Sequence, residues 1–336
     1  MASFATVTFC KGVLKLNRHA IDLWTVWLLG VVLGAPAMAQ DSETGNDFWG
    51  SLPNLRVPTL GGKQFWTDHA WRQGWRIQHN AVTGHWRLLD EHNVRWAWGA
   101  RDACQRELDA RVPSNSIPAD RVILLLHGLM RSANSMSSLG NYLHQELQVP
   151  VIYFEYASTR SSITSHAEAL AEVIDGLPEN VQIILVGHSM GNIVARRYLG
   201  DLATQREERL LNRIESFVMI GPPNQGSSIA KQLSKTGVFG WVTGAGGLEL
   251  GPGWDDFEKQ LAIPKCPFGI IAGRLPDNLP LNPLVDGQGD FVVSVEETKL
   301  PGAADFLEVP RIHSFLMDAP DVQAAVAQFI QTHQFE

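Results

Sequence analysis

The sequence predicts an α/β fold in which a mostly parallel central sheet carries helices on both faces. From Arg121 onward, short apolar runs without regular polar–apolar alternation recur along the chain, as expected for strands buried on both faces. Segments with the apolar spacing of helices lie between these runs. Because strands that alternate with helices pair in parallel, the pattern indicates one α/β domain over most of the chain.

The individual elements follow from the same patterns. Helical faces are formed by Ile163, His166, Leu170 and Val173, and near the C-terminus by Val322, Ala325, Val326 and Phe329. Folds of this class bind their ligands at the carboxyl ends of the strands. The runs expected to be strands are 122–127, 149–156, 181–187, 214–221 and 268–273.

Composition limits the partners. The chain has 336 residues, of which 45% are hydrophobic and 18% charged, and this suits a globular protein with a sizeable core. Its formal net charge is −8 at pH 7, so nucleic acid and anionic membrane surfaces offer no electrostatic attraction, and we expect neither as a partner. No cluster of Cys and His has zinc-site spacing, and we expect no metal and no cofactor.

Residues 1–39 have the pattern of a secretory signal peptide. Basic residues precede the apolar run Leu23 to Gly34, and the small residues Ala37 and Ala39 stand before Gln40. The run is short of the roughly 20 residues that span a bilayer. We expect cleavage, export to the periplasm or the medium, and no integral membrane association afterwards. An uncleaved anchor and a mis-assigned start are the alternatives.

The remaining chain divides into two parts. Residues 40–74 are rich in Gly, Pro and Trp and are expected to form an irregular N-terminal leader. Residues 75–336 are expected to form the α/β domain, which opens with a β-hairpin from Trp75 to Asp90 around the turn "NAVTG". Two cysteines remain after cleavage, Cys104 and Cys266, and both a disulfide and two buried thiols fit the sequence.

A nucleophile motif ends the strand at 181–187. Gly187, His188, Ser189, Met190 and Gly191 spell G-x-S-x-G, and a helical segment follows. The motif needs glycines because a sharp strand-to-helix turn leaves no room for side chains two positions before and after the serine. The pattern predicts an exposed, nucleophilic Ser189, and the alternative is a buried serine in an ordinary turn.

A serine nucleophile needs a base and an acid, which in this architecture follow it in the order acid, then His. His313 follows a strand-like run and precedes the final helix, whereas His333 belongs to a polar terminus, so His313 is the expected base. Asp290 is the preferred acid because it directly precedes the apolar run "FVVSV", expected to be a strand, and Asp286 is the alternative.

The segment His127-Gly128 ends the first buried strand and suggests an oxyanion hole. Two backbone N–H groups must face the oxygen on which charge develops. One belongs to Met190, next after the nucleophile, and the other to Leu129, with Gly128 allowing a close approach of the backbone. We expect His127 itself to brace the loop.

Seven stretches of the sequence carry a family resemblance: "LLLHGLMRSANSM", "YASTR", "GHSMGNIVARRYL", "GPPNQGS", "IAGR", "GDFVVSVEETKLPG" and "PRIHSFL". Together they resemble the α/β-hydrolase superfamily, in particular its bacterial lipase-like and esterase-like members, related to triacylglycerol lipases and GPI inositol-deacylase-like proteins. The resemblance implies the α/β-hydrolase fold and, by analogy, the triad Ser189, Asp290 and His313. Two departures are Asn192 and Phe291, which stand where many relatives have Gly.

The implied reaction is hydrolysis of a carboxylic ester through an acyl-serine intermediate. An acyltransferase with the same triad, a peptidase or amidase, and a catalytically silent binding module on the same fold are the competing functions. The apolar, glycine-rich segment 237–250 is either a mobile lid over an acyl pocket or a fixed packing loop. As a lid it would favour an ester with a hydrophobic acyl chain as the substrate.

Overall fold

The structure is a computed structural model that describes residues 57–59, 64–113, 119–234, 239–275 and 282–336. These residues all belong to one compact unit, Gly45–Glu336. The expected signal peptide, 1–39, lies outside the described residues, as does much of the expected leader.

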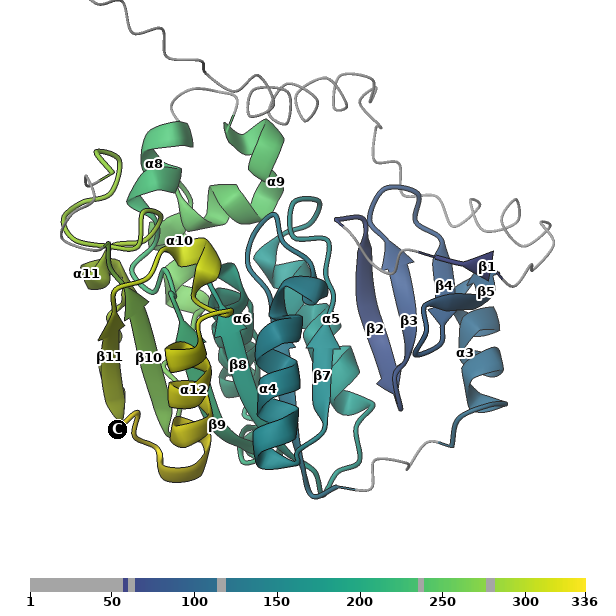
Figure 1. Cartoon of the computed structure of the whole chain (residues 1–336). Coiled ribbons are helices and arrows are strands. Elements are labelled where there is room, and N and C mark those ends of the chain that lie inside the picture. The colour runs from purple at the N-terminus through teal and green to yellow at the C-terminus, as the bar shows by residue number, and fades with distance from the viewer. Residues whose placement is uncertain (1–56, 60–63, 114–118, 235–238, 276–281) are drawn as a thin grey trace, which may run out of the picture. The chain divides into compact units, whose positions relative to one another are not determined.

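A parallel sheet forms the centre of the α/β domain, as the sequence predicts. Within the described residues it has six strands in the order β11-β10-β9-β8-β6-β7, and every neighbouring pair is parallel. Figure 1 shows these strands side by side. The strands are β6 (Arg121–Leu126), β7 (Val151–Phe154), β8 (Gln182–His188), β9 (Ile214–Ile220), β10 (Phe268–Gly273) and β11 (Asp305–Val309).

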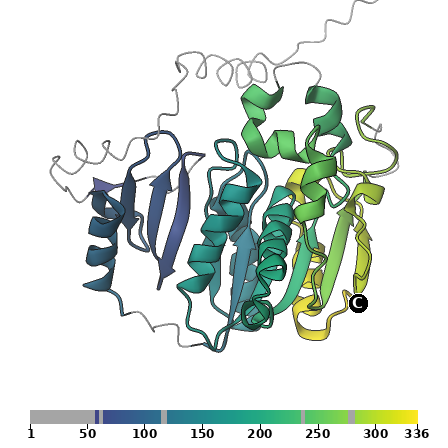
Figure 2. The ribbon, with the colours of Figure 1, turned by 180° about the vertical axis from the view of Figure 1, so that it is seen from behind.

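Helices cover both faces of this sheet. Helices α4 (Ser137–Leu147) and α12 (Pro320–Thr332) pack on one face through Leu139, Leu143 and Phe329, and they lie in front of the strands in Figure 1. Helices α5 (Ile163–Asp175) and α6 (Met190–Gln205) pack on the other face, which Figure 2 shows from behind. Shorter helices are α7 (Glu208–Leu211), α8 (Ser228–Ser234), α10 (Trp254–Phe257) and α11 (Val295–Thr298).

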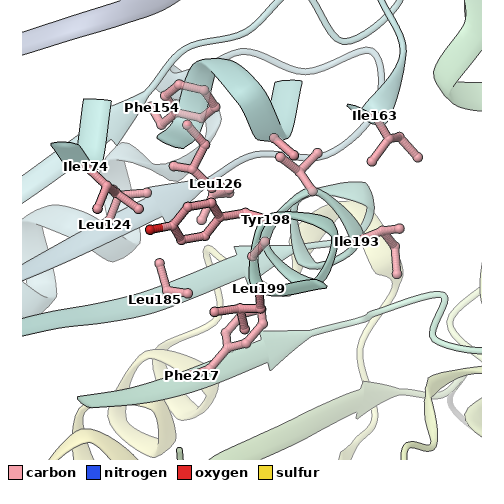
Figure 3. Close-up of a cluster of buried hydrophobic side chains, with 14 of the residues drawn as sticks. Leu124, Leu126, Phe154, Ile163, Ile174, Leu185, Ile193, Tyr198, Leu199 and Phe217 are labelled. Carbon is pink, nitrogen blue, oxygen red and sulfur yellow. The ribbon is translucent and has the colours of Figure 1, made fainter. Parts of the chain in front are cut away.

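The core between the sheet and α6 is closely packed. Figure 3 draws Tyr198 of α6 among Leu124, Leu126 and Leu185, which come from β6 and β8. All four side chains are almost completely excluded from water. Burial of each such side chain stabilises the fold by about 1.5–3 kcal/mol, so the helix after Ser189 is firmly fixed against the sheet.

An antiparallel sheet precedes the parallel sheet along the chain. It contains the expected hairpin, because β3 (Trp75–Asn80) pairs antiparallel with β4 (Trp86–Leu89). Its order is β1-β5-β4-β3-β2 in the described chain, with α3 (Arg101–Asp109) packed against it. The remaining strands are β1 (Val57–Pro58), β2 (Trp66–Arg72) and β5 (Val94–Gly99).

The expectation of an irregular leader over residues 40–74 is wrong at strand β2. This strand lies within that range, and it pairs with β3 from Trp66 to Arg72. The antiparallel sheet therefore begins before Trp75. The physical reason is a buried polar contact: Asp68, only 1% exposed, accepts a hydrogen bond from Gln78 of β3 at 2.7 Å.

The structure describes most of the glycine-rich segment 237–250 and both remaining cysteines. In the segment 237–250, residues from 239 onward form α9 (Phe239–Leu250), which is kinked at Gly244 with φ 68°, so this part is helical. Cys104 and Cys266 are both free thiols, and burial raises the pKa of Cys104 to about 12 and that of Cys266 to about 11. Among the described residues, no helix combines the length and apolarity that crossing a bilayer requires.

Candidate active site

Ser189 occupies the sharp turn between β8 and α6. It caps the helix with φ 54° and ψ −125°, a positive φ that a non-glycine residue adopts only under strain. Its N–H donates to the carbonyl of Ile220 at 2.9 Å, which ties the turn to the end of β9. The strand, turn and helix therefore have the order and the strain that the motif predicts.

The motif glycines are required by close contacts. A Cβ built on Gly191 would lie 2.5 Å from the Leu126 carbonyl oxygen, and one built on Gly187 would collide with the side-chain oxygen of Asn192. A Cβ on Gly128 would lie 3.0 Å from the Cβ of Ser189. The loop after β6 and the serine turn are thus in direct proximity.

His313 and Asp290 form a buried pair. The Nδ1–H of His313 donates to Oδ2 of Asp290 at 2.6 Å, and the His313 backbone N–H donates to the Asp290 carbonyl at 2.9 Å. His313 begins a short 3₁₀ turn after β11. Because the carboxylate accepts from Nδ1, it fixes the tautomer in which Nε2 lacks a proton and is available as a base.

The loop that carries Asp290 differs from the expectation. The run "FVVSV" after Asp290 is not a strand. Instead Oδ1 of Asp290 accepts the N–H groups of Val292 and Val293 at 3.0 and 2.8 Å, which turns the chain back on itself. Asp286, the alternative acid, is exposed. The residue preferred from the sequence does contact His313, but the stated reason, a following strand, is wrong.

The ring of His313 lies beside the residues that flank Ser189. A Cβ on Gly221 would meet the His313 ring at 3.1 Å, and Gly221 follows Ile220, which accepts the N–H of Ser189. His188, directly before Ser189, donates from Nε2 to the His313 carbonyl at 3.1 Å, and the two rings are 4.8 Å apart. The serine turn and the histidine therefore meet at the carboxyl ends of β8 and β9.

His188 was not assigned a role from the sequence. It is 2% exposed, and burial, followed by the nearby charge of His313, lowers the pKa of His188 well below its ordinary value. His188 therefore stays neutral and adds no positive charge beside His313. No signal in the sequence reveals this contact, because the two residues are 125 positions apart.

The expected oxyanion-hole residues come from two separate segments of the chain. Met190 is the first residue of α6 and is buried, whereas Leu129 is half-buried in the loop after β6. His127, as expected, braces this loop: its Nδ1 donates to the Gly128 carbonyl at 2.9 Å and its ring stacks on Tyr156 at 4.0 Å. Burial lowers the pKa of His127 to about 4, so it is neutral near pH 7.

The two departures from the resembled family have structural consequences. Asn192 donates from Nδ2 to the carbonyls of Ser189 and Ile220, at 3.0 and 3.2 Å, and so reinforces the serine turn. Phe291 has φ 85°, in the left-handed region that favours glycine, and it is 49% exposed beside Asp290. In the described parts of the chain, no group of three or more His, Cys, Asp or Glu side chains is arranged to hold a metal ion.

Residues 123–331 match the model of the alpha/beta hydrolase family, so the chain belongs to this family. Among solved structures it is similar to the mature form of the Bacillus licheniformis lipase BlEst2, with a TM-score of 0.49 and 16% identity over 65% of this chain and 93% of that chain. It is also similar to the metagenomic carboxyl esterase MGS0156, with a TM-score of 0.45 and 18% identity over 60% of this chain and 67% of that chain. No curated protein matches the sequence.

Proposed function

We propose that the protein is a serine hydrolase that cleaves carboxylic esters through an acyl-enzyme on Ser189. The observation that carries this proposal is the buried Asp290–His313 pair, joined at 2.6 Å, beside a serine in a strained strand-to-helix turn. A histidine oriented by a carboxylate, close to a half-buried serine in a sharp turn, is the arrangement that activates a hydroxyl for acyl transfer.

In the proposed reaction, Nε2 of His313 takes the proton of the Ser189 hydroxyl as Oγ attacks the ester carbonyl. The carbonyl oxygen becomes negative, and the N–H groups of Leu129 and Met190 donate to it. His313 returns its proton to the leaving alcohol, and then activates water to release the acid. Asp290 holds the His313 ring and stabilises its protonated form throughout.

The test is hydrolysis of p-nitrophenyl esters from acetate to palmitate. We expect turnover by the wild type and a loss of about 10⁴-fold or more in Ser189→Ala and in His313→Ala. His333→Ala is the matched control, because His333 is the other histidine downstream of Ser189, and it should keep its activity. Wild-type turnover that survives Ser189→Ala would contradict the proposal.

The acyl acceptor and the export of the protein can be tested separately. Adding acceptor alcohols to the assay distinguishes water from an alcohol as the acyl acceptor, because a transferase would form a new ester instead of free acid. We also propose export, on the pattern of residues 1–39 alone. N-terminal sequencing of the exported protein should then read from Gln40.

A further inference from the structure

The turn at residues 128–131 contains the N–H of Leu129, the proposed second oxyanion donor. The Arg131 N–H donates to the Gly128 carbonyl at 3.2 Å and closes the turn. Its third residue, Met130, has φ 60°, a left-handed conformation that costs a non-glycine residue free energy. A positive φ at this position reverses the direction of the central peptide. Contacts with residues outside the turn are therefore needed to offset the cost of this conformation.

Two side chains supply these contacts. The Met130 N–H donates to Oγ of Ser158 at 3.1 Å, and this hydroxyl donates in turn to Oε1 of Gln64 at 3.2 Å. The Gln64 amide completes the ring, because its Nε2 donates to the Arg131 carbonyl at 2.7 Å. One amide therefore engages both sides of the left-handed residue.

Gln64 stands two residues before the start of β2, which is hydrogen-bonded to the segment after β7. The Asp68 N–H donates to the Glu155 carbonyl at 2.9 Å, and the Glu155 N–H donates to Oδ2 of Asp68 at 2.8 Å. The Ala157 N–H donates to Oγ1 of Thr67 at 3.1 Å. Asp68 and Glu155 are 1% and 3% exposed, so these hydrogen bonds are protected from water. They hold the segment that follows Gln64 in a fixed position.

A second contact from the same segment reaches the end of the loop. Oε2 of Glu155 accepts the N–H of Ala133 at 3.1 Å. The loop after β6 is thus held at Met130, at Arg131 and at Ala133 by residues that β2 fixes in place. None of the three bonds involves the triad, so their effect on the reaction can be measured separately.

We propose that Gln64 is a positioning residue for the active site, which acts through Ser158 and Arg131 to aim the Leu129 N–H at the oxyanion. This inference rests on the proposed function. It makes the antiparallel sheet part of the catalytic apparatus. Because the oxyanion forms only as the reaction proceeds, a misplaced donor lowers kcat and leaves KM nearly unchanged. A displacement of about 1 Å can cost ~100-fold, and we expect a 10- to 100-fold fall in kcat.

The experiment compares Gln64→Ala and Gln64→Glu with the wild type. Ala removes every amide contact but keeps a Cβ, so it meets the same backbone demand at φ 56°. Glu keeps an acceptor oxygen for Ser158 but cannot donate to the Arg131 carbonyl. Three quantities are measured: kcat and KM for p-nitrophenyl butyrate, the rate at which a fluorophosphonate labels Ser189, and hydrogen exchange of the amides of residues 129–133.

Thr59→Val is the matched control. It removes a hydrogen bond of 2.9 Å from Oγ1 to the Asn93 carbonyl in the same antiparallel sheet, without touching the turn. In both Gln64 variants we expect a lower kcat, slower fluorophosphonate labelling of Ser189 and faster hydrogen exchange of the amides of residues 129–133. KM should be unchanged in these variants, and Thr59→Val should match the wild type in all of these quantities.

Two results would overturn the inference. If the Gln64 variants match Thr59→Val in kcat and in exchange, Gln64 does not position the turn, while wild-type turnover leaves the proposed function standing. If the wild type neither hydrolyses esters nor labels at Ser189, the proposed function fails and the catalytic role of Gln64 fails with it.

Discussion

The Nδ1 atom of His313 lies 2.6 Å from Oδ2 of Asp290, and both side chains are buried. This bond sets the tautomer of the histidine, so that Nε2 carries no proton and can act as the base. We therefore expect Asp290→Asn to reduce kcat by about 10³- to 10⁴-fold, because an amide that donates to Nδ1 favours the wrong tautomer. Steady-state kinetics with a p-nitrophenyl ester measures the effect.

Asp286→Asn is the control for this prediction. Asp286 is exposed and was the alternative acid from the sequence. Equal losses in the two variants would contradict the assignment of Asp290, as would full activity in Asp290→Asn.

Gly191→Ala should damage both the fold and the site. The added Cβ would lie 2.5 Å from the Leu126 carbonyl oxygen, and the backbone on both sides has little room to move. We expect a loss of about 1–3 kcal/mol in the free energy of unfolding, measured by urea denaturation, together with reduced turnover.

Gly176→Ala provides the comparison. Gly176 has φ −73°, and its added Cβ would make only ordinary contacts, of which the nearest is 3.4 Å from the Val173 carbonyl oxygen. This substitution should leave stability unchanged or raise it by up to about 1 kcal/mol. A Gly191→Ala variant as stable as Gly176→Ala would show that the serine turn is looser than its contacts imply.

Phe291→Gly should stabilise the protein. Phe291 has φ 85°, so its backbone is strained in the left-handed region, and it is 49% exposed, so packing of its side chain offsets little of this strain. Releasing that strain is expected to raise the free energy of unfolding by about 1 kcal/mol. Phe315→Gly is the control, since Phe315 is 60% exposed in a 3₁₀ turn, and removing it should not stabilise. A destabilised Phe291→Gly variant would mean that the ring makes a packing contribution larger than the strain.

His166 predicts a pH dependence of stability. In the described part of the chain neither of its ring nitrogens has a hydrogen-bond partner, and burial lowers its pKa from 6.5 to about 3. In the unfolded state His166 therefore binds a proton near pH 6.5, whereas in the folded state it binds one only near pH 3. Stability is unaffected above pH 6.5 and falls as the pH drops through that window, by about 2 kcal/mol at pH 5.

His166→Phe should remove this share of the acid sensitivity. The difference in unfolding free energy between variant and wild type, measured by urea at pH 7.5 and at pH 5, should shift by about 2 kcal/mol in favour of the variant. His92→Phe, at a side chain that is 80% exposed, should show no such shift. An identical difference at both pH values would mean that His166 is not held neutral.

Much of the fold could be predicted, and the residues of the proposed triad could be chosen, because both leave local signals. Strands buried on both faces read as unbroken apolar runs, and a nucleophile turn needs its glycines at fixed spacing. Strand β2 has no unbroken apolar run. Its buried Asp68 accepts hydrogen bonds from Gln78 of β3 and from Glu155, and the contact with Glu155, 87 residues away, cannot be read from one sequence.

The expected strand at "FVVSV" is absent for a local reason. Its composition favours a strand, but the side chain of Asp290 captures the N–H groups of Val292 and Val293, which a strand would have offered to a neighbour. Gln64 was overlooked for the reason that applies to Asp68: its partners, Arg131 and Ser158, are distant in sequence.

The most direct test of the central claim is labelling with a fluorophosphonate, followed by mass spectrometry of the peptides. Only an activated serine reacts rapidly with this reagent. We predict one adduct, on the peptide that contains Ser189, which disappears in Ser189→Ala and forms much more slowly in His313→Ala. A folded wild-type protein that gains no adduct on Ser189 would contradict the account and favour a catalytically silent member of the family.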